Sequence, residues 1–189
     1  MFLALGLIGL MVACAPATQL TKSWRDPSIT PGSLTPFKKV LVIARVKDET
    51  SNRIAEDKIV AAMKAGNGVP SYSYLSSRDT VQSALDARMQ KDGFDGLVLM
   101  KLTGVNKTLD YQPGTSYGGW YGYRYSSPGY VSEDQTFYVE TRIYSLTSGK
   151  MLWSGTTSTL NPTQFDQTIN DIIITVKDQL VKEGFIKPQ

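Results

Sequence analysis

The order of hydrophobic and polar residues along this chain predicts five strands and three helices. Residues 39–46 form an apolar run without alternation, which is typical of a central strand covered on both faces. The apolar positions of the helix that follows recur at helical spacing; they are Ala55, Ile59, Ala62 and Met63. We expect Thr50, Ser51 or Asn52 to cap the start of this helix and Gly66 to end it.

A second strand and helix come next. Residues 69–74 are predicted to form a short strand, and a helix is expected from about Asp79 to Gly93. The apolar face of this helix consists of Val81, Ala84, Leu85 and Met89. A third strand of the buried type is expected at residues 97–102.

Alternation of apolar and polar residues marks the second half of the chain. In residues 137–144 the positions expected to be buried are Phe137, Val139, Thr141 and Ile143. A turn at residues 147–149 leads to a hairpin partner at residues 151–155. The pattern therefore predicts an antiparallel pair with one wet face.

The last helix has the clearest pattern. We expect Asn161 to cap it, Pro162 to take its first position and Gln164 to close a capping box. One apolar stripe follows, formed by Phe165, Ile169, Ile172, Ile173, Val176 and Leu180. The helix is expected to end near Gly184.

The element order is therefore β-α-β-α-β, a loop, β-β and α. It predicts an α/β (α+β mixed) fold: a single domain over residues 37–187 with a mixed sheet, parallel in its first part and antiparallel in the hairpin. We see neither an internal repeat nor a second domain.

The amino terminus predicts the location of the protein. Residues 2–12 are an uncharged apolar run that suits a secretory signal and is too short for a permanent transmembrane helix. The segment from Met11 to Cys14 resembles the lipobox of bacterial lipoproteins, although Met11 stands where Leu is usual. The resemblance implies that residues 1–13 are a signal peptide and that Cys14 receives a diacylglyceryl group. Since the first basic residue is only Lys22, we expect the true start codon to lie upstream.

The predicted lipid would anchor the protein to a membrane without spanning it. Ala15 after the cysteine resembles lipoproteins sorted to the outer membrane, so we expect attachment there, on the periplasmic side. Residues 14–36 contain four prolines and are interpreted as a tether, of which Trp24 and the Asp26–Pro27 turn could instead dock on the domain.

An aromatic tract at residues 110–130 separates the two halves of the domain. It holds six of the ten tyrosines, Trp120 and five glycines, and is interpreted as a long exposed loop or flexible hairpin. Tyrosine with glycine is the composition of adaptable binding loops. The candidate partner-binding residues are Tyr117, Trp120, Tyr121, Tyr123 and Tyr125. An envelope protein or a second copy is the expected partner, a glycan is a possible one, and a low-complexity insertion without a ligand is the alternative.

Composition excludes several chemistries. The 189 residues include no His and one Cys, which excludes a Ser-His-Asp triad, a His-ligated zinc site and an intrachain disulfide. The net charge of +3 is too small to indicate a nucleic-acid partner. We expect neither a cofactor nor a metal.

Asp48 and Glu49 are the residues most suggestive of an enzyme. They follow the strand at residues 39–46, where ligands bind in open α/β sheets, and two carboxylates there could hold a divalent cation or act as an acid/base pair. The simpler interpretation is a solvated loop whose charges suit a helix amino terminus. A metal-dependent hydrolase is therefore an alternative to a non-enzymatic module.

Three segments resemble a known family. They are PFKKVLVIARVKDETSNR at residues 36–53, GFDGLVL at residues 93–99, and ETRIY at residues 140–144 with LWSG at residues 152–155. These segments resemble uncharacterised Gram-negative lipoproteins, which are similar in element order to the amino-terminal domain of TolB and, more remotely, to the curli-secretion lipoprotein. The resemblance implies an envelope location and a binding or assembly role, such as a subunit of a secretion or surface-assembly complex. It implies no catalytic residue.

Overall fold

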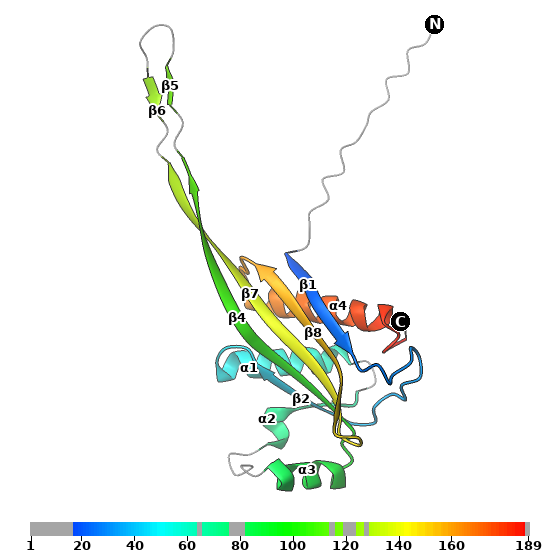
Figure 1. Cartoon of the computed structure of the whole chain (residues 1–189). Coiled ribbons are helices and arrows are strands. Elements are labelled where there is room, and N and C mark those ends of the chain that lie inside the picture. The colour runs from blue at the N-terminus through cyan, green and yellow to red at the C-terminus, as the bar shows by residue number, and fades with distance from the viewer. Residues whose placement is uncertain are drawn as a thin grey trace, which may run out of the picture.

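The computed structural model describes residues 17–63, 66–75, 82–113, 116–118, 124–126 and 129–187. Its main sheet has six strands in the order β1-β8-β7-β4-β2-β3, and a separate pair is formed by β5 and β6 (Figure 1). The strands are β1 (Thr18–Arg25), β2 (Val40–Arg45), β3 (Gly68–Pro70), β4 (Gly96–Gln112), β5 (Ser116–Gly118), β6 (Arg124–Ser126), β7 (Tyr130–Ser145) and β8 (Lys150–Leu160). The helices are α1 (Glu49–Ala62), α2 (Ser71–Tyr74), α3 (Gln82–Lys91) and α4 (Phe165–Lys182).

The sheet is mixed, as the sequence predicts. β2 pairs in parallel with β3 and β4, whereas β4, β7, β8 and β1 are antiparallel to their neighbours. The predicted α/β class and single domain with a mixed sheet are confirmed.

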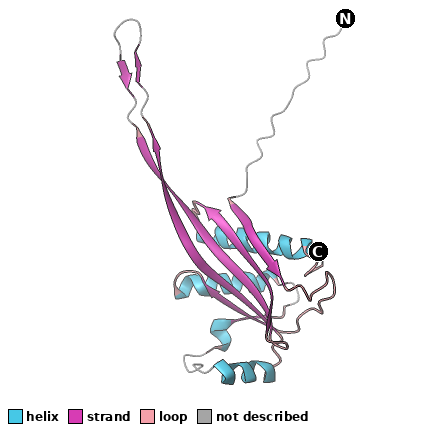
Figure 2. Ribbon diagram, viewed as in Figure 1, coloured by secondary structure: helices cyan, strands magenta, loops and turns pink. Residues whose placement is uncertain are grey.

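Two helices cover one face of the sheet. α1 and α4 lie side by side behind the strands in Figure 2, and they pack against each other as well as against the sheet. The main core lies between them and the strands; it includes Val42, Met100, Val139 and Trp153 from the sheet and Ile59, Ile169, Ile172 and Val176 from the helices. The predicted apolar stripe of α4 is confirmed, with Phe165 and Ile173 partly buried at its margin.

The opposite face is covered only in part. A smaller cluster joins Leu41 of β2 to Met89 of α3 and to Phe94, so α2 and α3 close the β3–β2 side. Beyond Leu97 at the start of β4, which packs against this cluster, none of the described helices covers this face of β4, β7, β8 and β1 (Figure 2). We call this uncovered area the open face. None of the helices within the described ranges is long and apolar enough to cross a membrane.

The start of α1 differs from the prediction. Asp48, rather than Thr50, Ser51 or Asn52, is the N-cap, and its Oδ1 accepts a hydrogen bond of 2.9 Å from the backbone N–H of Ser51. The Asn52 side chain instead accepts a hydrogen bond from the N–H of Val46. The helix therefore begins two to four residues earlier than the sequence pattern alone indicates.

The strand predicted at residues 69–74 is wrong beyond Pro70. Pro70 pairs with Val42 as the last residue of β3, and proline has no N–H with which to continue the ladder. The next residues form the short helix α2 because the carboxylate of Glu56 accepts hydrogen bonds from the Ser71 hydroxyl and the Tyr72 N–H. The buried Glu56 thus fixes this turn.

The tether predicted for residues 14–36 is also wrong in part. Residues 18–25 form the edge strand β1, which pairs with β8 along its length. The side chains of Ser23 and Arg25 donate hydrogen bonds to Glu183 at the end of α4. The folded domain therefore begins by Thr18, and docking, the alternative given for Trp24 and the Asp26–Pro27 turn, extends over the whole of β1.

Asn161 does not cap α4. Its backbone has a φ of 45°, its side-chain oxygen accepts from the N–H of Gln135, and its amide donates to Asp134. The side chain is committed to β7, so the helix starts at Phe165 with Gln164 as an N-cap that makes no side-chain capping bond.

Candidate binding surface

A two-stranded ribbon extends beyond the rest of the sheet. One row of paired residues crosses four strands; it consists of Thr18, Thr159, Phe137 and Val105. β8 ends one residue further, at Leu160, and only β4 and β7 continue, as far as the pair of Gln112 and Tyr130 (Figure 1). We call residues 107–112 and 130–135, the six outermost pairs, the ribbon.

The face of the ribbon that continues the core is apolar and uncovered. Leu109, Tyr111 and Val131 are 70%, 67% and 61% exposed. Val131 lies eight residues before Val139 on β7 with no bulge between them, so both lie on the face that α1 and α4 cover further down the sheet. Tyr111 pairs with Val131, and Leu109 is two residues away on the same face. The apolar pattern of the core thus runs on beyond the helices.

Charges on this face are paired. The Nζ of Lys107 lies 2.8 Å from Oε1 of Glu133, and the Gln135 amide donates to the same oxygen at 2.9 Å. These two bonds lower the pKa of the Glu133 carboxyl, and the bond from Lys107 has the larger effect. The apolar side chains therefore flank a neutralised ion pair. The opposite face carries polar residues, with Thr108 paired to Asp134, and the 66% exposed Tyr130 at its outer end.

The aromatic tract predicted as a loop or flexible hairpin is a hairpin in its described parts. β4 and β7 extend to Gln112 and Tyr130, and Tyr117 of β5 pairs directly with Tyr125 of β6. Of the other predicted partner-binding residues, Trp120, Tyr121 and Tyr123 lie outside the described residues. Cys14 also lies outside them, and its acylation stays a prediction.

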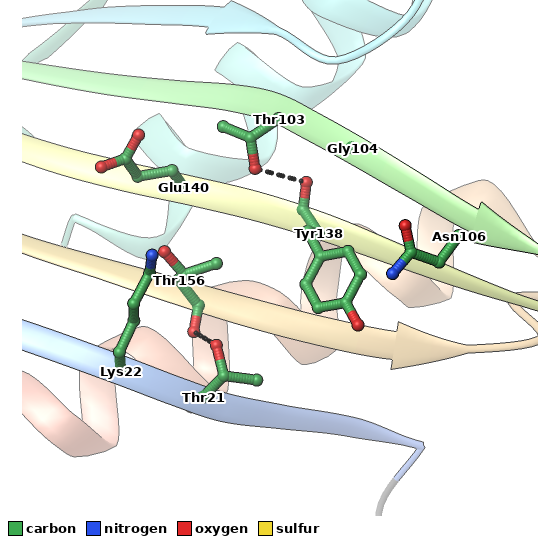
Figure 3. A pocket seen from close by; sticks show the side chains of 8 residues that line it. All are labelled: Thr21, Lys22, Thr103, Gly104, Asn106, Tyr138, Glu140 and Thr156. Carbon is green, nitrogen blue, oxygen red and sulfur yellow. Dashed lines mark hydrogen bonds between the residues drawn. The ribbon is translucent and has the colours of Figure 1, made fainter.

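A shallow hollow of about 440 Å³ lies on the open face (Figure 3). It is lined by Thr21, Lys22, Thr103, Gly104, Asn106, Tyr138, Glu140 and Thr156. Both described bulges of the flanking strands, between Leu20 and Lys22 and between Leu102 and Gly104, lie at its sides. Bulges increase the local twist of a sheet, which accounts for the concave surface here.

The hollow offers hydrogen-bonding groups without an acid/base pair. The Thr21 hydroxyl donates to the Thr156 carbonyl at 2.9 Å, and the Thr103 hydroxyl donates to the Tyr138 carbonyl at 3.2 Å (Figure 3). Oε2 of Glu140 accepts from Arg142 at 2.7 Å, and this bond, with a second that Arg142 donates to Tyr144, raises the pKa of the guanidinium. The Glu140 carboxylate is therefore already engaged.

The two acids proposed for a hydrolase are bound locally. Asp48 caps α1, and the N–H of Ser51 lowers the pKa of its carboxyl. Glu49 accepts a hydrogen bond of 2.9 Å from Nε of Arg53, one turn along the helix. The adjacent hollow of about 480 Å³ is lined by Lys47, Ser51, Ile54, Gln164, Phe165 and Asp166, and by neither acid. Within the described ranges no three Asp, Glu, Cys or His side chains are grouped as metal ligands.

Sequence reasoning missed the apolar face of the ribbon. The tract drew attention for its composition, whereas Leu109 and Val131 are the exposed residues that the structure adds. A signal was present, because Val105, Leu109 and Tyr111 occupy alternate positions at the two-residue period of a strand, with the charged Lys107 as the one interruption.

No family model matches the chain, and no curated protein matches its sequence. Among solved structures, the chain is similar to a PelC dodecamer from Paraburkholderia phytofirmans, with a TM-score of 0.45 and 12% identity over 86% of this chain and 96% of that chain. It is similar to lipoprotein GNA1162 from Neisseria meningitidis, with a TM-score of 0.42 and 14% identity over 76% of this chain and 98% of that one. It is also similar to TolB from Acinetobacter baumannii, with a TM-score of 0.35 and 14% identity over 87% of this chain and 31% of TolB.

Proposed function

We propose that this chain is a lipid-anchored, non-enzymatic contact module of the bacterial cell envelope. Cys14 would carry the lipid and hold the domain at the outer membrane on its periplasmic side. The ribbon and the aromatic tract would contact a second component of the envelope.

The observation that carries this proposal is the uncovered apolar face of the ribbon. Leu109, Tyr111 and Val131 are each more than half exposed and lie together on adjacent rungs. Monomeric soluble proteins seldom expose contiguous large apolar side chains without an interaction that covers them. Tyrosine is also enriched in the residues that dominate binding energy at interfaces.

The absence of an enzymatic role is part of the proposal. Asp48 and Glu49 each use their carboxylate in a bond within α1, so neither is poised to bind a metal or a substrate. The hollow on the open face is lined by hydroxyl and amide groups, by Lys22 and by Glu140, whose carboxylate is held by Arg142, so its lining suits holding a polar ligand.

The anchor is tested by a Cys14→Ser variant, followed by membrane fractionation and mass spectrometry of the amino-terminal peptide. We expect the intact protein to be acylated and retained in the membrane fraction and the variant to be unprocessed or soluble. Normal retention of the variant would contradict the proposed anchor.

The contact role is tested by in-cell cross-linking of the intact protein and of a variant with residues 111–130 replaced by a Gly/Ser linker. We expect a discrete cross-linked species that disappears with the tract. A ladder of self-linked species would identify the second component as another copy of the chain. Asp48→Asn is the matched control and should leave cross-links and phenotype unchanged. A phenotype that follows Asp48 rather than the tract would favour the hydrolase instead.

A further inference from the structure

The described start of the chain and the ribbon lie at the same end of the sheet. Thr18, the first residue of β1, pairs with Thr159 in the row that also contains Val105 at the base of the ribbon. β1 runs from this row toward the opposite end, so the chain enters the domain beside the ribbon (Figure 1). Three strand spacings, about 14 Å in total, separate Thr18 from β4.

The predicted anchor is separated from this row by only a few residues of sequence. Cys14 precedes Thr18 by four residues, and a fully extended chain spans at most about 14 Å over that length. An acyl chain on Cys14 would therefore hold Thr18 within about 14 Å of the membrane surface, and the base of the ribbon lies three strand spacings from Thr18 in the same row.

The ribbon is long enough to reach that surface. Tyr111 is six residues beyond Val105 on β4, which corresponds to about 20 Å of strand. This length exceeds the greatest span of the four residues that precede Thr18. A sheet held by Cys14 can therefore place the outer rungs of the ribbon at the same bilayer.

The exposed side chains suit a lipid interface better than water. Leu109 and Val131 offer branched apolar groups, while Tyr111 combines an aromatic ring with a hydroxyl, a combination enriched where membranes meet water. The charges between them are paired, since Lys107 binds Glu133 on the same face. The geometry and the chemistry of this face thus agree on one occupant.

We infer that the ribbon face formed by Leu109, Tyr111 and Val131 rests on the bilayer that holds the acylated Cys14. This inference depends on the proposed acylation and adds a second membrane contact, on the outer rungs of β4 and β7. Two contacts would orient the domain, with α3 at the end of the sheet that lies away from the membrane.

Site-specific fluorescence tests the inference in the full-length acylated protein. Because Cys14 is the only cysteine and would be blocked by its lipid, an introduced cysteine is the only free thiol. An environment-sensitive dye is attached to Leu109→Cys or Val131→Cys after reconstitution into phosphatidylethanolamine vesicles with a minor phosphatidylglycerol fraction. Lipids that carry a nitroxide near the headgroup then quench any dye at the interface. Thr108→Cys on the opposite face and Lys91→Cys at the end of α3 are the controls.

We expect about twofold quenching at Leu109 and Val131 and little change at both controls. Acylated protein without quenching at Leu109 and Val131 would overturn the membrane contact and leave the proposed anchor intact. Equal quenching at Thr108 would overturn the assignment of this face. Protection of the dye only when another envelope protein is added would replace the lipid with a protein partner. An unmodified Cys14, seen by mass spectrometry, would overturn both proposals.

Discussion

The buried carboxylate of Glu56 offers the sharpest test of how this fold is held together. The side chain is 1% exposed, and Oε1 accepts from the N–H of Ala44 at 3.0 Å and from the Ser71 hydroxyl at 2.6 Å. Ala44 needs this acceptor because β3 ends opposite Val42, so the next N–H along the same edge of β2 has no strand partner. Glu56 therefore completes an edge of the sheet.

The expected loss in Glu56→Ala follows from those donors. The Ala44 N–H and the Ser71 hydroxyl are both buried, and each buried donor without an acceptor costs about 1–3 kcal/mol. The variant no longer buries a charged carboxylate, which offsets part of this cost, whereas the cavity left by the side chain adds to the cost. We expect the free energy of unfolding to fall by about 3–5 kcal/mol. Glu56→Gln keeps one oxygen acceptor and the volume, so its loss should be about 1–2 kcal/mol.

Urea unfolding followed by tryptophan fluorescence measures these losses, since Trp153 is fully buried. Asp57→Ala is the matched control: Asp57 is the next residue of α1, is exposed, and accepts one bond from the Tyr72 hydroxyl. Its effect should be at most about 0.5 kcal/mol. If Glu56→Ala cost no more than this control, the reasoning that the buried carboxylate completes β2 would be refuted.

Three further predictions concern packing, pH and a turn. Gly155→Ala would drive a methyl group into the ring of Trp153, so we expect a loss of about 1–3 kcal/mol in thermal unfolding, against almost none for Gly104→Ala, which has room. Asp48→Ala should lower the melting temperature at neutral pH. Folding lowers the pKa of the Asp48 carboxyl, so its contribution to stability is present above the pKa of the unfolded state and is lost as the pH falls through the pKa of the folded state. The melting temperatures of the wild-type protein and of the variant should therefore converge in acid. A difference between them that stays constant with pH would contradict this. Asn161→Ala removes two side-chain hydrogen bonds at a residue with positive φ, and we expect it to lower the free energy of unfolding by about 1–3 kcal/mol. Asn161→Gly removes the same bonds but adopts the positive φ without backbone strain, so its loss should be smaller. Equal losses in the two variants would show that the strain is negligible.

Local patterns in the sequence were sufficient for the elements that bury a continuous apolar surface. The unbroken run at residues 39–46 predicted β2, and the stripe from Ile169 to Leu180 predicted α4, because a covered strand and an amphipathic helix leave distinct periods. The alternation around Val139 predicted which face of β7 is buried. The fold class followed from the order of these elements.

Long-range contacts decided the rest. The strand at residues 18–25 is polar and lies at the sheet edge, so it is recognisable only once β8 supplies its hydrogen-bonding partner. Asn161 has the sequence signature of a helix cap, but its side chain bonds to β7, which is distant in sequence. In both cases a backbone or side-chain hydrogen bond could be satisfied by several partners, and only the packed structure selects one.

The candidate surface could be predicted from the sequence only in part. The sequence by itself located the aromatic tract and predicted a lipid on Cys14, because composition and the lipobox-like segment are properties of consecutive residues. It did not indicate that Leu109, Tyr111 and Val131 share one uncovered face, or that this face projects from the end of the sheet where Thr18 enters. Those relations depend on strand register, which is set by cross-strand pairing and by which face the helices cover, and so only the tertiary structure determined them.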